Sequence, residues 1–395
     1  MLRKKKEKSF KPNYRGGSVV NLMASVGRAL GYPSRYQQLD LLPAKELAKS
    51  KNVVIFLIDG LGYEFLTKYG KKSCMKQHLK GKMTSVFPST TTSSVTSFMT
   101  GVAPQQHALT GWFMYAKEVA TIIKPIRYST RQGNIHLSNF DVKVKDLISC
   151  KSFFSKIKPK SFFIGPDVIA DSEYTNTSGF KATFVKFEHE NVEEMFVKTR
   201  RVIKGSNRKK YIYTYWPGFD SREHEFGVNH KEVKRHFKEL DEGFSKFLDS
   251  IEGSNTTVIL TADHGQINCG KKKTVIVNKH PGLAECLRLP LGGEPRVAYC
   301  YVNPSKAKQF EEYVKTKLAK YCDIYKSETL VKRNYFGLGP VNPKLYDRIG
   351  DYVLIMKKNY AIRDFLPGEE FDFNVADHGG LSKEEMFVPL VVVKV

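Results

Sequence analysis

Six side chains that can hold metal ions stand beside apolar runs of the chain. They belong to aspartate and histidine, whose oxygen and nitrogen atoms suit Zn²⁺, with Mn²⁺ or Fe as alternatives. The six residues are Asp59, Asp220, His224, Asp263, His264 and His378. A single aspartate at a strand end is more often a turn or cap residue, but the coincidence of all six in such positions argues against that explanation. Three carboxylates and three imidazoles are enough for two adjacent divalent ions.

The segment SVFPSTTTSSVTSFMTG, residues 85–101, concentrates hydroxyl groups where a loop turns into a helix. Serine and threonine accept backbone N–H bonds at helix starts, so capping is one explanation. The other is that one hydroxyl is a nucleophile aimed at a phosphate held by metal ions. Two ions about 3.5–4 Å apart can stabilise both the attacking and the leaving oxygens of a displacement at phosphorus. The positive end of the helix would also attract the phosphoryl oxygens.

The elements that would position these groups are buried strands that alternate with helices. Continuous apolar runs predict parallel strands, because parallel sheets are covered on both faces. We expect strands at 52–59, 161–164, 211–216, 256–265 and 387–395, and helices at 61–70, 93–100 and 231–251. The functional groups of such sheets gather at the carboxyl ends of the strands, so residues far apart in sequence can converge.

This alternation predicts an α/β fold with a mostly parallel central sheet flanked by helices. The pattern changes between residues 271 and 364, where strands at 296–302 and 351–357 flank a helix at 304–321. We interpret this part as a smaller α+β insert or cap. The predicted organisation is a basic N-terminal segment (1–50), an α/β catalytic core (51–270 and 365–395) and the insert (271–364).

The composition is that of a globular protein with a large positive charge. Of 395 residues 41% are hydrophobic, and the formal net charge is +24. This charge favours anionic partners, although lysines spread along the chain would also arise in a lysine-rich proteome. The RKKKEK run at residues 3–8 is expected to be a solvated tail.

Several classes of protein are disfavoured by what the sequence lacks. No specific nucleic acid-binding motif, apolar membrane span or secretory signal is visible, and the six cysteines lack metal-binding spacing. We therefore expect a cytoplasmic protein that acts on a small-molecule phosphate ester. The sequence gives no indication of its oligomeric state.

Five motifs together resemble the alkaline phosphatase superfamily. They are IFLIDGLG, FPSTTTSSVTSFMTGVAPQQHALTGW, DSREHEFG, TADHGQ and ADHGGLSKEEMFVPL. Within the superfamily, the chain is most similar to the type I phosphodiesterase/nucleotide pyrophosphatase family, over about residues 52–395. The resemblance implies that Thr91 is the nucleophile and leaves Ser93 or Ser94 as capping groups. The metal ligands it implies are Asp59, Thr91, Asp263 and His264 for one ion, and Asp220, His224 and His378 for the other.

The substrate pocket departs from the family pattern. Trp112 stands near the position of an asparagine that helps to hold the phosphoryl group, and Glu223 replaces a glycine before a metal-binding histidine. Trp112, Phe113 and Tyr115 are candidates for an apolar wall against the substrate, with ordinary core packing as the other explanation. Asp377, next to His378, is expected to be a turn or supporting residue.

The resemblance and the residues together predict a two-metal hydrolase. It would cleave a phosphodiester or pyrophosphate bond of a nucleotide-like substrate through a phosphothreonine intermediate. A phosphomonoesterase or phosphonate hydrolase on the same metal centre is the alternative. A non-catalytic anion-binding protein is a third hypothesis, which the presence of all six ligands disfavours.

Overall fold

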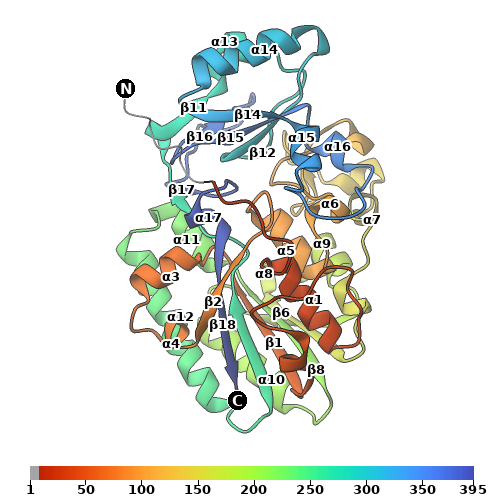
Figure 1. Ribbon diagram of the computed structural model, residues 1–395, viewed down its shortest axis with the longest axis vertical. Coiled ribbons are helices and arrows are strands. Elements are labelled where there is room, and N and C mark those ends of the chain that lie inside the picture. The colour runs from red at the N-terminus through yellow and green to blue at the C-terminus, as the bar shows by residue number, and fades with distance from the viewer. Residues whose placement is uncertain (1–8) are drawn as a thin grey trace.

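The computed structural model describes residues 9–395, which form one large sheet and several smaller ones (Figure 1). The RKKKEK run lies outside the described residues. The large sheet has seven strands in the order β2-β18-β9-β1-β8-β6-β7. Their bounds are β1 (Asn52–Ile58), β2 (Leu79–Thr84), β6 (Lys160–Pro166), β7 (Ala182–Phe187), β8 (Lys210–Trp216), β9 (Thr256–Thr261) and β18 (Phe387–Lys394).

The central strands β9, β1, β8, β6 and β7 are mutually parallel. β18 runs antiparallel to both β9 and β2. The predicted α/β fold with a mostly parallel sheet is thus confirmed. The edge strands β2 and β7 were not predicted, because they are half exposed and lack a continuous apolar run.

Helices cover both faces of the large sheet. On one face, Phe56 of β1 packs against Phe196 of α10 (Val192–Lys204) and against Phe244 and Phe247 of α12 (Lys231–Ser250). On the other face, Phe98 of α5 (Thr91–Thr100) lies against Tyr213 of β8. Because both faces are covered, β1 is buried along its whole length, as its apolar sequence requires.

The segment predicted as a basic N-terminal stretch contributes to the main core. Within its described part, α1 (Val19–Ala29) is buried at all positions from Val19 to Gly27 and lies beside α5. Ser18 and Asn21 form a capping box at its start, which is the sequence signal for this helix. The short helix α2 (Ala44–Ala48) packs on α1.

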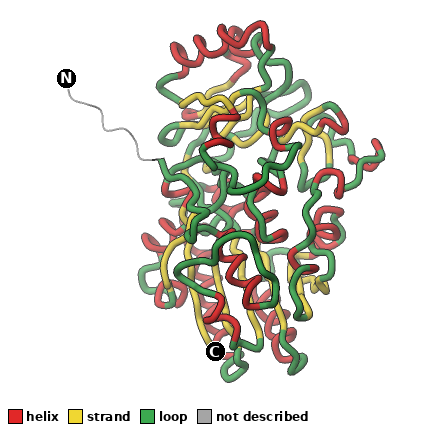
Figure 2. The backbone as a smooth tube through the Cα atoms, turned by 45° about the vertical axis from the view of Figure 1, so that its right-hand side comes forward, coloured by secondary structure: helices red, strands yellow, loops and turns green. Residues whose placement is uncertain are grey.

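Residues 271–364 contain a second sheet with a hydrophobic cluster of its own. Its order is β12-β13-β15-β14, and all neighbours are antiparallel. Figures 1 and 2 show it at the opposite end of the molecule from the C-terminal end of β18. The bounds are β12 (Gly292–Glu294), β13 (Val297–Cys300), β14 (Cys322–Lys326) and β15 (Tyr352–Met356), with helices α13 (Pro281–Ala284), α14 (Ala307–Tyr313), α15 (Ser327–Lys332) and α16 (Leu345–Arg348).

The predicted helix at 304–321 is divided, since α14 continues into a π-helical turn at Val314–Leu318.

The remaining elements are short. Further strands are β3 (Met114–Ala116), β4 (Thr121–Lys124), β5 (Ser129–Thr130), β10 (Ile267–Asn268), β11 (Thr274–Ile276), β16 (Ala361–Arg363) and β17 (Ala376–Asp377). Other helices are α3 (Tyr63–Tyr69), α4 (Cys74–Gln77), α6 (Pro104–His107), α7 (Val144–Leu147), α8 (Asp167–Ala170), α9 (Glu173–Ser178), α11 (Gly218–Phe226) and α17 (Lys383–Met386). Within residues 9–395, no helix combines the length and apolar character that crossing a membrane requires.

Candidate metal centre and nucleophile

The carboxyl ends of three neighbouring parallel strands deliver most of the candidate metal ligands. Asp59 directly follows β1, Asp263 and His264 follow β9, and α11, which carries Asp220 and His224, begins just after β8. The three strands end level with one another in the register of the sheet. Their polar ends therefore meet at one edge, as parallel topology predicts.

Gly60 allows α11 to approach β1 closely. Its φ is +78°, in the left-handed region that favours glycine. A Cβ atom at this position would lie 2.9 Å from the Cα of Asp220. Any other residue at position 60 would push Asp220 away from Asp59.

His264 lies at the centre of the cluster. Its Nε2 atom is 3.4 Å from Asp59 Oδ1, 3.4 Å from Asp263 Oδ2 and 4.0 Å from Asp220 Oδ1. The ring of His378 stacks on that of His264, with centroids 3.8 Å apart. Two compact groups have ligand atoms within 4.8 Å of one another, namely Asp59, Asp263 and His264, and Asp220, His264 and His378.

His224 lies beside the second of these groups, one helical turn after Asp220. Its Nε2 atom is 3.3 Å from Asp220 Oδ2, and its ring centroid is 5.1 Å from that of His378. Its Nδ1–H donates to the carbonyl oxygen of Ala376 at 2.8 Å. This bond directs Nε2 toward the cluster. All six side chains predicted as metal ligands thus lie in one place.

Thr91 lies in the first turn of α5, directly beside the cluster. Its Oγ1 atom is 3.1 Å from His264 Nε2. Every other residue from 85 to 101 is buried, whereas Thr91 is partly exposed. Thr91 is therefore the one hydroxyl of this run that a substrate arriving from solvent can reach.

The other hydroxyls of the run make different contacts. Thr90, at the N-cap, makes no side-chain bond to the helix backbone and donates instead to Glu294. Ser93 donates to the carbonyl oxygen of Leu109 at 3.0 Å, and Ser94 Oγ has no hydrogen-bond partner among the described residues. The expectation that Ser93 or Ser94 caps the helix is wrong, because the helix begins at Thr91 and both serines lie inside it.

The three carboxylates crowd one another. Burial, and then repulsion by Asp263 and Asp220, raise the pKa of Asp59 well above its usual range. Burial also raises the pKa of Asp263. Burial alone would raise the pKa of Asp220, but the neighbouring histidines outweigh it and lower that pKa. Asp59 and Asp263 therefore need nearby positive charge in order to ionise.

The histidines show opposite shifts. Burial would lower the pKa of His224, but the adjacent Asp220 carboxylate outweighs it and raises that pKa to about 9. Burial, and then the charge of His264, lower the pKa of His378 well below its usual range. His378 is therefore neutral, which is the form that binds metals.

Unsatisfied atoms of the cluster fit divalent cations. Asp59 Oδ1 and Asp263 Oδ2 are buried with no hydrogen-bond partner in the part of the chain that the structure describes. Buried polar atoms of this kind cost free energy unless a donor or a cation satisfies them. The oxygen and nitrogen donors suit Zn²⁺, Mn²⁺ or Fe. The residues present therefore form a candidate metal site for two ions.

Two further side chains orient the candidate ligands. The Tyr215 hydroxyl donates to Asp59 Oδ2 at 2.5 Å, and Gln266 Nε2 donates to Asp220 Oδ1 at 2.5 Å. Neither was predicted, although Gln266 follows directly after the TADHG motif and Tyr215 is the penultimate residue of its strand. Asp377 pairs with Arg363 at 3.0 Å and accepts a hydrogen bond from Asn374 Nδ2, which also contacts His224. A supporting role for Asp377 stays a prediction.

Glu223 is fully buried next to the metal ligands on α11. Both its carboxylate oxygens lack a hydrogen-bond partner among residues 9–395. Burial, and then the nearby Asp220, raise the pKa of Glu223 well above its usual range. Burial therefore disfavours the charged form of Glu223, which stands where the family resemblance led us to expect a glycine.

The three aromatic residues predicted as a substrate wall occupy different surroundings. Phe113 lines a cavity of about 970 Å³ between β5, β12 and the loop after β16, with the Arg131 guanidinium 4.3 Å from its ring. The backbone N–H of Trp112 donates to Glu294. Tyr115 packs against Tyr301, with ring centroids 5.6 Å apart. Their contact with a substrate stays a prediction.

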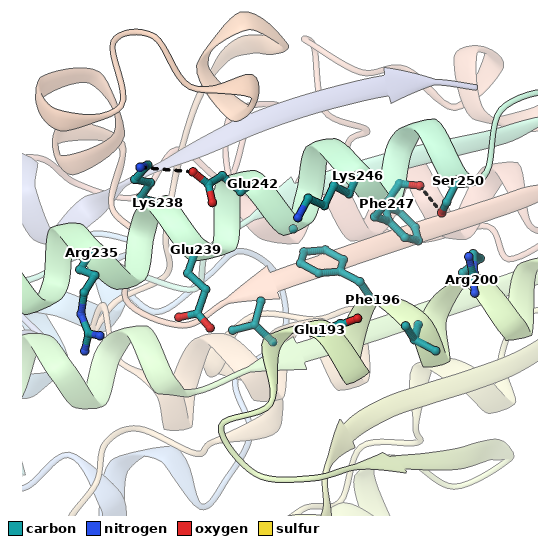
Figure 3. Close-up of a pocket in the computed structure, with 13 residues that line it drawn as sticks. Glu193, Phe196, Arg200, Arg235, Lys238, Glu239, Glu242, Lys246, Phe247 and Ser250 are labelled. Carbon is teal, nitrogen blue, oxygen red and sulfur yellow. Dashed lines mark hydrogen bonds and ion pairs between the residues drawn. The ribbon is translucent and has the colours of Figure 1, made fainter.

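A second hollow, of about 560 Å³, lies between α10 and α12 (Figure 3). Phe196 and Phe247 form its floor, and charged side chains such as Arg200, Arg235 and Glu239 surround it. The candidate metal ligands do not line it. We therefore assign the chemistry to the end of the sheet that carries Thr91.

Comparison with known proteins agrees with this geometry. A family model described as type I phosphodiesterase / nucleotide pyrophosphatase matches residues 53–380. The chain belongs to this family. It is accordingly a metal-dependent phosphoryl hydrolase. No curated protein sequence matches it.

Solved structures of low sequence identity share the fold. Murine ectonucleotide pyrophosphatase/phosphodiesterase 5 is 17% identical with a TM-score of 0.64, over 86% of this chain and 87% of that chain. The human protein of the same name is 15% identical with a TM-score of 0.63, over the same shares of 86% and 87%. Phosphonoacetate hydrolase from Sinorhizobium meliloti 1021 is 17% identical with a TM-score of 0.60, over 87% of this chain and 90% of that chain.

Proposed function

We propose that this chain cleaves a phosphodiester or pyrophosphate bond of a nucleotide-like substrate, with Thr91 as the nucleophile and two divalent ions, Zn²⁺ first and Mn²⁺ or Fe as alternatives. The observation that carries the proposal is the position of Thr91. Its hydroxyl is the accessible one of residues 85–101 and lies 3.1 Å from a nitrogen of the cluster. The family to which the chain belongs, and the murine structure described as a complex with AMP, support a nucleotide-like substrate.

The candidate ligands would hold the two ions on either side of His264. Asp59, Asp263 and His264 would hold one ion together with Thr91, and Asp220, His224 and His378 the other. When bound, such ions lower the pKa of a hydroxyl or water and balance the charge on the attacking and leaving oxygens.

The chain's own residues would orient the reaction. α5 presents Thr91 at its N-terminus, where the partial positive charge of the helix attracts the phosphoryl oxygens. Thr91 Oγ would form a bond to phosphorus while the bond from phosphorus to the leaving oxygen breaks. Water would then attack phosphorus and release Thr91 Oγ, so that two displacements complete the hydrolysis.

An alternative substrate class is supported by one of the solved structures that share the fold, a phosphonoacetate hydrolase in complex with phosphonoacetate. Phosphate release from phosphonoacetate, with no turnover of a diester, would support this alternative. A phosphomonoesterase would instead prefer p-nitrophenyl phosphate.

The test of the main proposal compares bis-p-nitrophenyl phosphate with p-nitrophenyl phosphate. We expect faster turnover of the diester, loss of activity after dialysis against a chelator, and recovery with Zn²⁺, Mn²⁺ or Fe. The metal that restores the highest kcat identifies the preferred ion. A metal-loaded, folded protein with no turnover of either ester or of phosphonoacetate would contradict the proposal and favour a non-catalytic anion-binding role.

We also propose a cytoplasmic location. All six cysteines are free thiols, which suits a reducing compartment. Fractionation of cells that express the tagged chain would test this directly.

A further inference from the structure

Glu294 is a buried carboxylate of the second sheet. It reaches residues 85–90, the loop that leads into Thr91 and that we call the nucleophile loop. It ends β12, and only 7% of it is exposed. A Cβ atom on Gly379 would lie 2.7 Å from the Cβ of Glu294, so the two backbones are in close contact. Gly379 directly follows His378. Glu294 thus lies between the nucleophile loop, which ends just before Thr91, and the loop that carries His378.

One oxygen of this carboxylate makes two short hydrogen bonds. Glu294 Oε1 accepts the Thr90 hydroxyl at 2.5 Å and the backbone N–H of Trp112 at 2.6 Å. Hydrogen bonds of this length are typical of an ionised acceptor. Because Thr90 immediately precedes Thr91, these bonds fix the start of α5. Glu294 also lines the cavity of about 970 Å³ to which Phe113 contributes.

The position of Glu294 has an electrostatic consequence for the substrate. A phosphoryl group attacked by Thr91 would lie next to the residue that follows Thr90, and the Thr90 hydroxyl contacts Glu294. Like charges that approach each other in a partly buried site repel more strongly than they do in water. A phosphodiester carries one negative charge, whereas a phosphomonoester carries close to two above about pH 7. The second charge would meet the carboxylate at close range.

We propose that Glu294 is a specificity-determining residue, which disfavours phosphomonoester dianions relative to diester monoanions while it positions the loop that carries Thr91. This inference rests on the proposed phosphodiesterase function and names the charge class of its substrate. The backbone N–H of Trp112 helps to hold the Glu294 carboxylate in this position. Burial raises the pKa of Glu294 to about 7, against the lowering effect of its bonds to Thr90 and Trp112, so the carboxylate is ionised in mildly alkaline solution.

The decisive experiment removes the charge of Glu294 and keeps the shape of its side chain. Glu294→Gln and the wild type are assayed at about pH 8.5, where both the carboxylate and a monoester are fully charged. We expect the ratio of kcat/KM for bis-p-nitrophenyl phosphate over that for p-nitrophenyl phosphate to fall about tenfold, through a gain on the monoester. Glu285→Gln is the matched control, since Glu285 is an exposed acid of the same part of the chain, and it should leave the ratio unchanged.

Two further variants separate charge from position. Thr90→Val removes a hydrogen bond to Glu294 but keeps the carboxylate, so it should lower both kcat/KM values equally. Glu294→Asp keeps the charge and should keep the wild-type preference even if overall activity falls. A Glu294→Gln protein that loses activity equally on both esters, or keeps the wild-type ratio, overturns the inference and leaves the phosphodiesterase function in place.

A measurement on the wild type covers the case in which Glu294→Gln does not fold. Sulfate is a dianion and methyl sulfate a monoanion, and both mimic a phosphoryl group. Both anions keep their charge between about pH 6 and pH 9, whereas Glu294 ionises in this range. The inhibition constant of sulfate relative to that of methyl sulfate should therefore rise with pH. A ratio that stays constant or falls overturns the inference. A wild type that hydrolyses neither ester contradicts the proposed function itself.

Discussion

The metal cluster and the neighbouring cavity are built on different principles. The cluster collects residues from the ends of parallel strands in one sheet, and its members are held in place by buried backbone. The cavity is lined in part by the antiparallel sheet of residues 271–364, which brings Glu294 to Thr90. Under the two proposals above, the main sheet would supply the chemistry and the second sheet would select the substrate. Changes in the main sheet should therefore affect every substrate alike, and changes in the second sheet should affect substrates differently.

The largest effect is expected at the nucleophile. Thr91→Ala removes the attacking oxygen and should lower kcat on every ester by about 10⁴-fold or more. Ser94→Ala is the matched control, because Ser94 lies one turn further along α5 with a hydroxyl that has no partner in the described residues. Steady-state kinetics should show wild-type kcat for the control. Comparable losses in both variants would show that α5, and not the Thr91 oxygen, is what the reaction needs.

The connection between the two sheets should be visible in stability. Arg296, next to β13, forms a fully buried bidentate pair with Glu385 of α17, which also accepts the backbone N–H of Gly380 at 2.7 Å. Arg296→Met leaves the Glu385 charge buried and should lower the free energy of unfolding by about 3–5 kcal/mol.

Urea denaturation measures this change, with Arg288→Met as the control. Arg288 pairs with Asp351 while both are about half exposed, so its loss should cost less than about 1 kcal/mol. Equal losses of unfolding free energy in the two variants would indicate that the buried pair stabilises the contact between the sheets no more than an exposed pair does.

A moderate effect is expected from the side chains that orient the ligands. Gln266→Ala removes the donor to Asp220 and should weaken metal binding by about 10- to 100-fold. Titration of the metal-free protein with Zn²⁺, followed by calorimetry, measures this affinity. Gln37→Ala, at an exposed glutamine far from the sheet end in sequence, should bind Zn²⁺ like the wild type. Unchanged Zn²⁺ affinity in Gln266→Ala would show that Gln266 does not support the candidate metal site.

The smallest effect is expected from Thr90. Thr90→Val removes one hydrogen bond of about 1 kcal/mol and should lower kcat/KM about fivefold. The loss should be the same for diester and monoester substrates, because the charge of Glu294 is retained. A loss confined to one substrate would place Thr90 itself in contact with the substrate.

The convergence of the candidate metal ligands was predictable because its signal is local. Asp59, Asp263 and His264 each end an apolar run, and the topology of parallel sheets brings such ends together whatever the sequence between them. The same reasoning predicted the central strands. It could not find β2 or β7, since an edge strand needs only one covered face and lacks the continuous apolar run.

Glu294 could not be predicted, because nothing near it in the sequence indicates its role. Its partner Thr90 lies 204 residues away, and the contact depends on how the second sheet packs on the first. The helix α1 is an intermediate case. Its capping box, Ser18 with Asn21, and the apolar run that follows are both local signals, but basic residues precede them and the whole of residues 1–50 was interpreted as a basic segment.

The place of β18 within the large sheet has a consequence for synthesis. This strand lies between β9 and β2, and His378 comes shortly before it, so both are translated after the whole of residues 271–364. On the ribosome, the edge of β9 that pairs with β18 therefore stays unpaired while residues 271–364 are synthesised. A nascent chain in this state exposes strand backbone to aggregation, and early folding of the second sheet would shorten that interval.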